Sequence, residues 1–302
     1  MSLNYYGLDP CHYVSSPSLS WDAMLLLTSI ELDLITDIQI YQFLENGIRG
    51  GLSQCSLRYA KANNKYLPNF NEEDPNSFLV YLDCVNLYGY AMMQQLPYKN
   101  FRFLTQNELI SFDINSISPD SNEGYILEVD MQYPPNIHDE HSDLPFAAEK
   151  LAVPISSNIS NKKLVANLYD KYKYVIHYLH LQECLRNGLV LLKIHRILAF
   201  SQKAFLEPYI SLNTSLRQNA TSDFERDFFK KQNNSIFGKT IENKRKQVDV
   251  KLVNVWKDYF NNTNKVCGAE KYVSAPNFKN LAIISDSLVA IQLRPTKVIL
   301  DR

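Results

Sequence analysis

Residues 126–133 alternate between two kinds of side chain, and this alternation constrains the fold more than any other feature of the sequence. Ile126, Glu128, Asp130 and Gln132 alternate with Leu127, Val129, Met131 and Tyr133. Successive side chains of a β-strand point to opposite faces of its sheet. The segment is therefore predicted to be a strand with one face in water and the other face buried.

Other segments predict helices and further strands around this one. Helices are predicted from Trp21 to Leu44, His180 to Asn187, Pro208 to Asn219 and Ser222 to Asn243. Strands are predicted at Phe78–Leu82, Leu189–Phe200, Val248–Val253 and Leu281–Leu293. The short polar turn between the last two helices favours an αα-hairpin. We therefore expect an α+β fold in which this helical hairpin projects from a sheet.

Charge is distributed unevenly, although the formal net charge is only -1. Nine Lys and Arg lie from Leu216 to Lys251 against five acids, and four lie from Glu45 to Tyr66 against one. Ten acids and no Lys or Arg lie between Arg102 and Lys150. The two basic stretches suit phosphate groups. The acidic piece is expected to face away from phosphates or to be an ordinary solvated surface.

The five cysteines are scattered and form no CxxC pair, which favours a reduced, intracellular protein without a zinc site. No run of residues reaches the roughly 18 apolar side chains of a membrane span. We therefore expect no membrane among the partners.

The first candidate site is Asp83-Cys84-Val85-Asn86-Leu87-Tyr88-Gly89, where the predicted apolar strand leads a carboxylate into a turn. Magnesium prefers carboxylate and phosphate oxygens, so Asp83 is a candidate metal ligand. The backbone N–H groups of the following turn could bind a triphosphate. The alternative is that Asp83 only caps the next helix.

The second candidate site is Lys230-Lys231-Gln232-Asn233-Asn234-Ser235-Ile236-Phe237-Gly238, within a segment of helical pattern. Helical spacing places Arg226, Lys230, Asn234 and Phe237 on one face, and Phe224, Phe228 and Ser235 roughly opposite. The face with Phe224 and Phe228 is expected to be core. Cations for phosphates, a ring for a base and Gly238 for close approach suit a bound nucleotide. The alternative is an amphipathic helix with a solvated basic face.

Two similar-looking patterns do not support a function. Gly238-Lys239-Thr240 is similar to the end of a phosphate-binding loop, but Asn233 replaces the required upstream glycine and no strand precedes it. Asp286 follows an apolar run, yet it is a single carboxylate where a paired-carboxylate turn needs two. Asp286 is therefore predicted to be a turn residue.

Taken together and in this order, the two candidate sites resemble motifs A and B of family B DNA polymerases. Asp83 to Gly89 is similar to D-x-x-S-L-Y-P, with Asn86 in place of Ser and Gly89 in place of Pro. Lys230 to Gly238 is similar to K-x-x-x-N-S-x-Y-G, with Phe237 in place of Tyr. Ile48-Arg49-Gly50-Gly51 is similar to the Y-x-G-G element of protein-primed members, with Ile48 replacing the Tyr.

The resemblance extends over nearly the whole chain and is to polymerases of self-synthesising DNA transposons and related viruses. Among the flanking segments that support it are Leu8-Asp9-Pro10, Trp21-Asp22-Ala23-Met24 and Phe224 to Asn243. It implies a DNA template-primer and a dNTP as partners, a terminal priming protein as a further candidate partner, and Mg²⁺ as cofactor in a two-ion site.

The resemblance also implies a role for individual residues. Asp83 would be the catalytic metal ligand, and Tyr88 would lie under the sugar and reject a 2′-hydroxyl. Lys230 and, in approximate register, Arg217 would bind the triphosphate. Asn234, Phe237 and Gly238 would line the nascent base pair, while Arg49, Gly50 and Gly51 would contact template DNA.

The implied architecture is a polymerase palm sheet with a fingers helical hairpin. Residues 1–76 would form a pre-palm segment with the template-contacting turn, and 77–205 the first part of the palm with an acidic insertion. Residues 206–245 would form the fingers hairpin, and 246–302 a truncated return to the palm. Because neither an exonuclease domain nor the Y-x-D-T-D motif C is present, the chain is expected to be an interior fragment that is inactive in isolation.

The function expected from the resemblance is template-directed transfer of dNTPs to a primer 3′-hydroxyl. The first alternative is a catalytically inactive nucleic-acid-binding remnant of such a polymerase. A second alternative is an unrelated α+β interaction domain. Nucleotide binding would separate the polymerase from the inactive remnant. DNA binding would separate both of them from the unrelated interaction domain.

Overall fold

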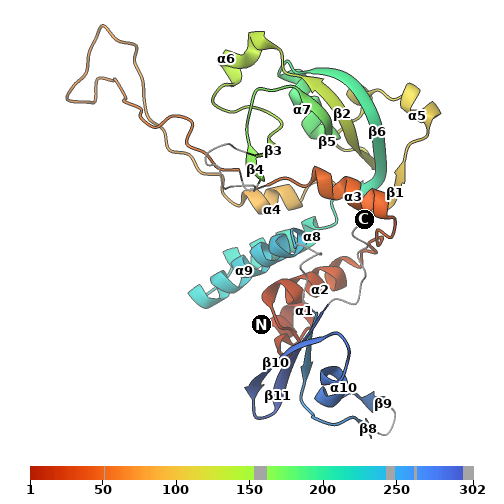
Figure 1. The fold of residues 1–302 in the computed structure, drawn as a ribbon. Coiled ribbons are helices and arrows are strands. Elements are labelled where there is room, and N and C mark those ends of the chain that lie inside the picture. The colour runs from red at the N-terminus through yellow and green to blue at the C-terminus, as the bar shows by residue number, and fades with distance from the viewer. Residues whose placement is uncertain (51, 153–161, 243–248, 262–263, 295–302) are drawn as a thin grey trace. The chain divides into compact units, whose positions relative to one another are not determined.

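A computed structural model describes residues 1–50, 52–152, 162–242, 249–261 and 264–294, apart from the side chains of 260–266 (Figure 1). The chain divides into two compact units. Unit 1 comprises Met1–Ile30, Asn86–Gln94 and Phe205–Arg302, and unit 2 comprises Glu31–Val85 and Gln95–Ala204. Each unit mixes helices with antiparallel strands, so the α+β prediction is confirmed at this level. The assignment of four polymerase subdomains stays a prediction.

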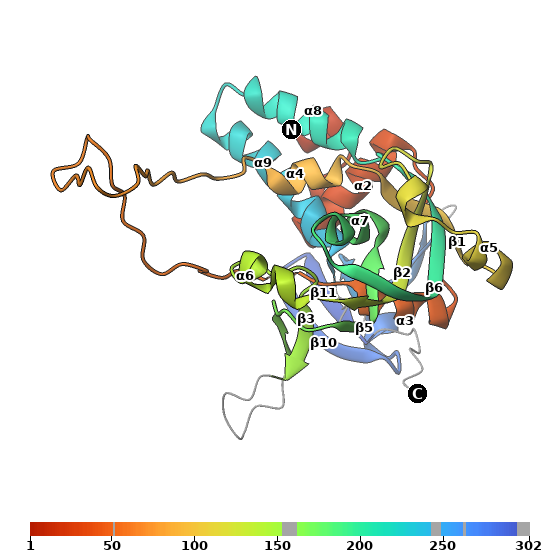
Figure 2. The same cartoon turned by 90° about the horizontal axis from the view of Figure 1, so that it is seen from above.

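Unit 2 is built on an antiparallel four-stranded sheet in the order β1-β6-β2-β5 (Figure 2). The strands are β1 (Leu96–Phe103), β6 (Val190–Lys203), β2 (Glu123–Gln132) and β5 (Lys171–His177). The predicted alternation is confirmed in β2, because the side chains of Leu127, Val129 and Met131 are fully buried. Hydrophobic burial on one strand face thus fixes the register of the central strand.

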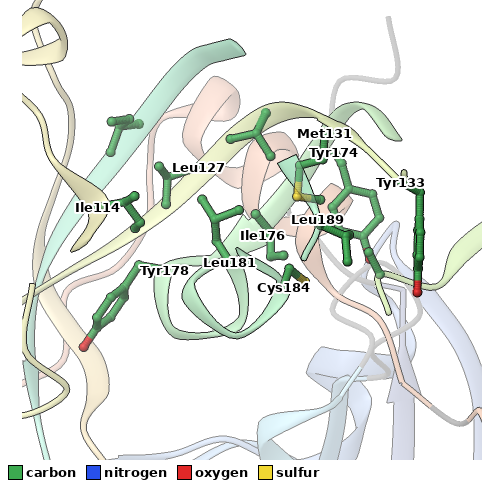
Figure 3. Packing of buried hydrophobic residues seen from close by; sticks show 13 residues of the cluster. Ile114, Leu127, Met131, Tyr133, Tyr174, Ile176, Tyr178, Leu181, Cys184 and Leu189 are labelled. Carbon is green, nitrogen blue, oxygen red and sulfur yellow. The ribbon is translucent and has the colours of Figure 1, made fainter. Parts of the chain in front are cut away.

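Helix α7 (Tyr178–Arg186) covers one face of this sheet. Figure 3 shows Tyr178, Leu181 and Cys184 of the helix beside Leu127 and Ile176 of the strands. The predicted helix end is also confirmed, since Gly188 has a φ of +93°, which L side chains rarely adopt. The opposite face of the sheet is covered by helix α3 (Ile38–Gly47).

The remaining elements of unit 2 flank this core. Helix α5 (Gln106–Ile110) follows β1, and helix α6 (His138–His141) follows β2. Strands β3 (Glu149–Ala152) and β4 (Lys162–Val165) form a separate antiparallel pair. Single 3₁₀ turns lie at Pro10–His12 in unit 1 and at Ile114–Ser116 and Pro135–Ile137 in unit 2.

Unit 1 contains a group of helices and a small sheet. Its helices are α1 (Ser2–Tyr6), α2 (Ser16–Thr28), α4 (Leu87–Met92), α8 (Glu207–Gln218), α9 (Asp223–Thr240) and α10 (Ala269–Val273). Its sheet has the order β10-β11-β7, with β10 (Phe278–Ser285), β11 (Leu288–Leu293) and β7 (Asp249–Val253). Strands β8 (Tyr259–Asn261) and β9 (Asn264–Val266) pair with each other. The two predicted helices of the hairpin are therefore present as α8 and α9, whereas their identity as polymerase fingers stays a prediction.

The single helix predicted from Trp21 to Leu44 is wrong, because two helices occupy this stretch. Helix α2 ends where Ser29 takes the left-handed conformation, with a φ of 49°. Helix α3 begins after Asp37, whose carboxylate accepts hydrogen bonds from the backbone N–H groups of Gln39 and Ile40. The apolar spacing continues through the break, so periodicity alone hid an N-cap that Asp37 supplies.

The buried strand predicted at Phe78–Leu82 is also wrong. The segment has no regular secondary structure, and no strand in the described part of the chain pairs with it. Its side chains are exposed, up to 95% for Tyr81. A strand forms only when a neighbour supplies its ladder of hydrogen bonds, and none is present here. Figure 1 draws residues 52–85 as a long loop in orange, and Phe78–Leu82 lie near the C-terminal end of this loop.

The single strand predicted at Leu281–Leu293 is a hairpin. Strands β10 and β11 pair antiparallel, and Asp286 and Ser287 form the turn between them. The prediction that Asp286 is a turn residue is confirmed.

Candidate functional site

Helix α9 is the longest helix of unit 1 and holds the second candidate site. Ser222 caps its N-terminus by accepting a hydrogen bond from the backbone N–H of Glu225 at 3.2 Å. Its buried stripe consists of Phe229, Gln232, Asn233 and Ile236. These positions follow the i, i+3, i+4, i+7 spacing of a helix with one face in a core.

The prediction that the face with Phe224 and Phe228 is core is wrong for Phe224. Its side chain is 73% exposed, and Phe228 is half-buried against the ring of Tyr6. Gln232 and Asn233 are buried instead. The sequence had predicted no packing contact for either residue. Gln232 Oε1 and Asn233 Nδ2 have hydrogen-bond partners there, whereas Asn233 Oδ1 is buried without one among the described residues.

Hydrogen bonds attach the polar part of this stripe to the neighbouring helices. Gln232 Oε1 accepts from Ser20 Oγ at 2.6 Å and from Tyr209 Oη at 3.4 Å. Asn233 Nδ2 donates to the backbone oxygen of Ile210 and to Thr214 Oγ1, both at 3.4 Å. Helix α9 is therefore held against α2 and α8 in a defined rotation, which decides which side chains remain exposed.

A neighbouring face of α9 carries the residues predicted to bind a nucleotide. Lys230 and Asn234 are exposed and Phe237 is half-buried. At 100° per residue, Lys230 lies almost directly above Phe237 on the helix surface. Gly238 has open space where a Cβ would stand. Arg226, on the same face, forms an ion pair with Asp223 at 2.8 Å.

A ring contact joins the two candidate sites within unit 1. Tyr88 of α4 stacks on Phe237 of α9 with ring centroids 4.1 Å apart and an interplanar angle of 20°. Tyr88 is 56% exposed, so one face of its ring remains available to a ligand. Two segments far apart in the sequence thus form one surface, which we call the Tyr88–Lys230 face and define by Tyr88, Lys230, Asn234 and Phe237.

Arg217 lies in the last turn of α8 and is exposed. Helices α8 and α9 are joined by a short connection and lie side by side (Figure 1). Asn233 of α9 contacts Thr214 of α8. From this contact, Arg217 lies three residues closer to the connection along α8, and Lys230 lies three residues closer to it along α9. The two cations therefore stand at about the same level of the hairpin.

Asp83 is exposed and belongs to the unpaired segment of unit 2. A magnesium site needs several oxygen ligands around the ion. No group of three or more His, Cys, Asp or Glu side chains gathers anywhere in the described ranges. The role of Asp83 as a magnesium ligand stays a prediction.

Arg49, predicted to contact DNA, has its guanidinium engaged inside unit 2. It donates to the backbone oxygen of Val175 at 2.6 Å and lies 3.8 Å above the ring of Tyr174. Burial lowers the pKa of Arg49, although the nearby Tyr174 and Glu149 act in the opposite direction. Gly50 is exposed, and Gly51 lies outside the described residues. The role of this turn in DNA binding stays a prediction.

Within the described ranges, no helix combines the length and the apolar character needed to cross a lipid bilayer. No family model matches the sequence, and no curated protein does.

Among solved structures, the chain is similar to Phi29 DNA polymerase complexed with primer-template DNA and incoming nucleotide substrates. The TM-score is 0.46 at 12% identity, over 78% of this chain and 37% of that chain. An orthorhombic crystal form of Phi29 DNA polymerase gives a TM-score of 0.47 at 12% identity, over 80% of this chain and 38% of that chain. The chain therefore spans well under half the length of the solved structures it matches.

Proposed function

We propose that the Tyr88–Lys230 face binds an incoming deoxynucleoside triphosphate, and that the chain is the core of a template-directed DNA polymerase. The observation that supports this most is the stack of Tyr88 on Phe237 at 4.1 Å. It places the tyrosine of one polymerase-like motif against the aromatic residue of the other. Chance resemblance in two separate segments would not require them to meet.

The charge on this face suits a triphosphate. Lys230 precedes Phe237 by two helical turns, about 10 Å along the axis. A nucleotide with its base or sugar beside the two rings can therefore extend its phosphates toward the Lys230 ammonium. Lys230 has no ion-pair partner among the described residues, so its charge is available to a ligand. The polarity of the site thus changes from aromatic to cationic along one helix.

Each residue of the face then has a chemical task. The Lys230 ammonium would neutralise the outer phosphates and the charge that develops on the leaving pyrophosphate. Tyr88 would lie under the sugar, and Asn234 would donate or accept hydrogen bonds beside it. Arg217, level with Lys230, would add a second cation. Asp83 would offer one carboxylate to Mg²⁺, and we assign no step to it.

The finer features of the proposal follow the resemblance to protein-primed family B polymerases. The partners would be a DNA template-primer, a dNTP and a terminal priming protein, in an intracellular element of the transposon or viral type. Arg49 and Gly50 would lie near template DNA, and α8 and α9 would serve as the fingers hairpin.

A second candidate is an inactive remnant that binds nucleic acid without binding nucleotides. Such a remnant needs only the basic stretches from Glu45 to Tyr66 and from Leu216 to Lys251, and no metal site. Its basic stretches would still bind DNA with an affinity that falls as salt rises, because phosphate contacts release counterions.

Equilibrium binding of a fluorescent dATP analogue to the full chain, with primed DNA present, tests the proposal. A hydrogen bond to a charged group contributes about 1.5–3 kcal/mol, so Lys230→Ala should weaken binding by about tenfold or more. Lys231→Ala removes an exposed lysine from the adjacent position of the same helix, about 120° from Phe237 around its axis. This control should change the Kd less than about twofold.

Equal effects of the two lysine variants would place Lys230 on a merely solvated surface and contradict the proposal. DNA binding without any binding of the dATP analogue would support the inactive remnant. Neither DNA nor nucleotide binding would leave an unrelated interaction domain as the remaining reading.

A further inference from the structure

The residue before α4 has an unusual backbone. Asn86 has φ 55° and ψ 42°, which is the left-handed conformation, and its side chain makes no capping hydrogen bond. For most L-residues this conformation costs about 1–2 kcal/mol, whereas Asn adopts it more readily. A residue at the N-cap position is usually extended and uses its side chain as the cap. Asn86 therefore does not cap α4 with its side chain, and it begins the helix from a left-handed backbone conformation.

Gly89 explains where the Asn86 side chain goes. A Cβ on Gly89 would lie 2.6 Å from both Cγ and Oδ1 of Asn86 and would also collide with its Nδ2. Gly89 is buried although its neighbours Tyr88 and Tyr90 are 56% and 65% exposed. The Asn86 amide thus covers Gly89 and occupies the space that any other side chain would fill.

A glycine inside a helix is itself unfavourable by roughly 0.5–1 kcal/mol relative to alanine. Its presence in the short helix α4 therefore indicates a requirement for space. Asn86 and Gly89 are also the two positions at which the segment departs from the D-x-x-S-L-Y-P pattern. The two departures touch each other in the structure, and a Cβ at position 89 would need the space that the Asn86 amide fills.

Tyr88 lies between these two residues. Its ring is placed against Phe237 by the turn that begins at Asn86 and by the first turn of α4. The backbone N–H of Tyr90 donates to the backbone oxygen of Asn86 at 3.0 Å. This hydrogen bond connects the first turn of α4 to the left-handed residue. Any change that lifts the amide from Gly89 therefore acts on the turn that holds the tyrosine.

We propose that Asn86 and Gly89 are a matched pair of positioning residues that set the ring of Tyr88 against Phe237. The contact between them is independent of what the protein binds. Its consequence for nucleotide affinity rests on the proposed function.

Fluorine NMR of the full chain with 4-fluorophenylalanine at position 237 tests the pair. The Tyr88→Leu variant gives the fluorine shift that corresponds to a missing stack. Gly89→Ala should move the fluorine signal toward that value, because the new methyl group displaces the Asn86 amide. Adding Asn86→Gly should return the signal, since this change removes the amide and keeps a residue suited to positive φ.

Ala91→Gly is the matched control, because it changes the helix propensity of α4 by a similar amount, with the opposite sign, at an exposed position. It should leave the fluorine signal in place. Affinity for the dATP analogue should follow the same order, with a loss of about fivefold in Gly89→Ala and recovery in the double variant. A change limited to general helix stability would not be reversed by removing a second side chain.

An unmoved fluorine signal in Gly89→Ala, or no return in the double variant, would overturn the matched pair. If Gly89→Ala does not fold, a folded double variant supports the pair and an unfolded one refutes it. If the fluorine signals behave as expected while the wild-type chain binds no nucleotide, the proposed function fails and the positioning pair stands.

Discussion

The contact between Tyr88 and Phe237 can be measured as an energy. We predict a favourable coupling of about 1 kcal/mol between Tyr88→Leu and Phe237→Leu in a double-mutant cycle. Aromatic pairs with ring centroids 4.5–7 Å apart typically contribute about 0.5–1.5 kcal/mol beyond their buried area. The present pair is closer, at 4.1 Å, but Tyr88 is 56% exposed, so the middle of that range is expected.

The assay is urea unfolding of the wild type, the two single variants and the double variant. The only two tryptophans of the chain, Trp21 and Trp256, both belong to unit 1, so their fluorescence reports the unfolding of the unit that contains the stack. Residues without contact are additive to about 0.3–0.5 kcal/mol. A coupling energy below about 0.3 kcal/mol would therefore refute the contact and the joined surface with it.

Three further predictions concern unit 2. Glu149→Gln should destabilise it by about 3 kcal/mol in chemical unfolding followed by far-ultraviolet circular dichroism, because Lys171 is fully buried and donates to Glu149 Oε2 at 2.9 Å; a loss below about 1 kcal/mol would show that the pair is dispensable. Burial beside aromatic rings, with a smaller contribution from His180, lowers the pKa of His177 to about 4. Because the unfolded chain binds this proton first, stability should fall by at most about 3 kcal/mol as the pH drops from about 6.5 to about 4, and His177→Phe should flatten that slope in unfolding curves measured across the range. Tyr81→Lys should reduce self-association in sedimentation velocity, since the exposed apolar segment Phe78–Leu82 has the composition of an unpaired edge strand; equal association of both proteins would mean that the segment is not the contact.

Local pattern was sufficient where burial on one element decides the structure. The alternation around Val129 predicted β2 and its buried face, because a strand between two partners has no other stable register. The helix end before Gly188 and the helix start at Ser222 were predictable for a different reason, since each depends on the backbone conformation or cap of one residue.

Pattern failed where the answer depended on a partner elsewhere in the chain. Phe78–Leu82 has the composition of a buried strand, but no strand among the described residues pairs with it. Phe224 follows the helical period, yet the stripe that packs is set by Ser20 and Tyr209, which bind Gln232. Composition ranks Gln232 as a surface residue, and only the neighbouring helices show that it is buried.

The candidate site was predictable in its residues and not in its geometry. Spacing placed Lys230, Asn234 and Phe237 on one face of a helix, which α9 confirms. The meeting of Phe237 with Tyr88 required the fold, because Gln95–Ala204 of unit 2 lie between α4 and α9 in the sequence. The Asn86–Gly89 contact was not predicted from the sequence either. The signal that could have indicated it is an Asn three residues before a Gly at the start of a helix.

The most direct test of the central claim is photo-crosslinking of 8-azido-dATP to the full chain on primed DNA, with the modified peptides located by mass spectrometry. The account predicts labelled peptides from 86–94 and 223–240, and their labelling should disappear when excess unlabelled dATP competes. Labels that lie only outside these two segments, or labelling that excess dATP does not reduce, would contradict a nucleotide site on the Tyr88–Lys230 face.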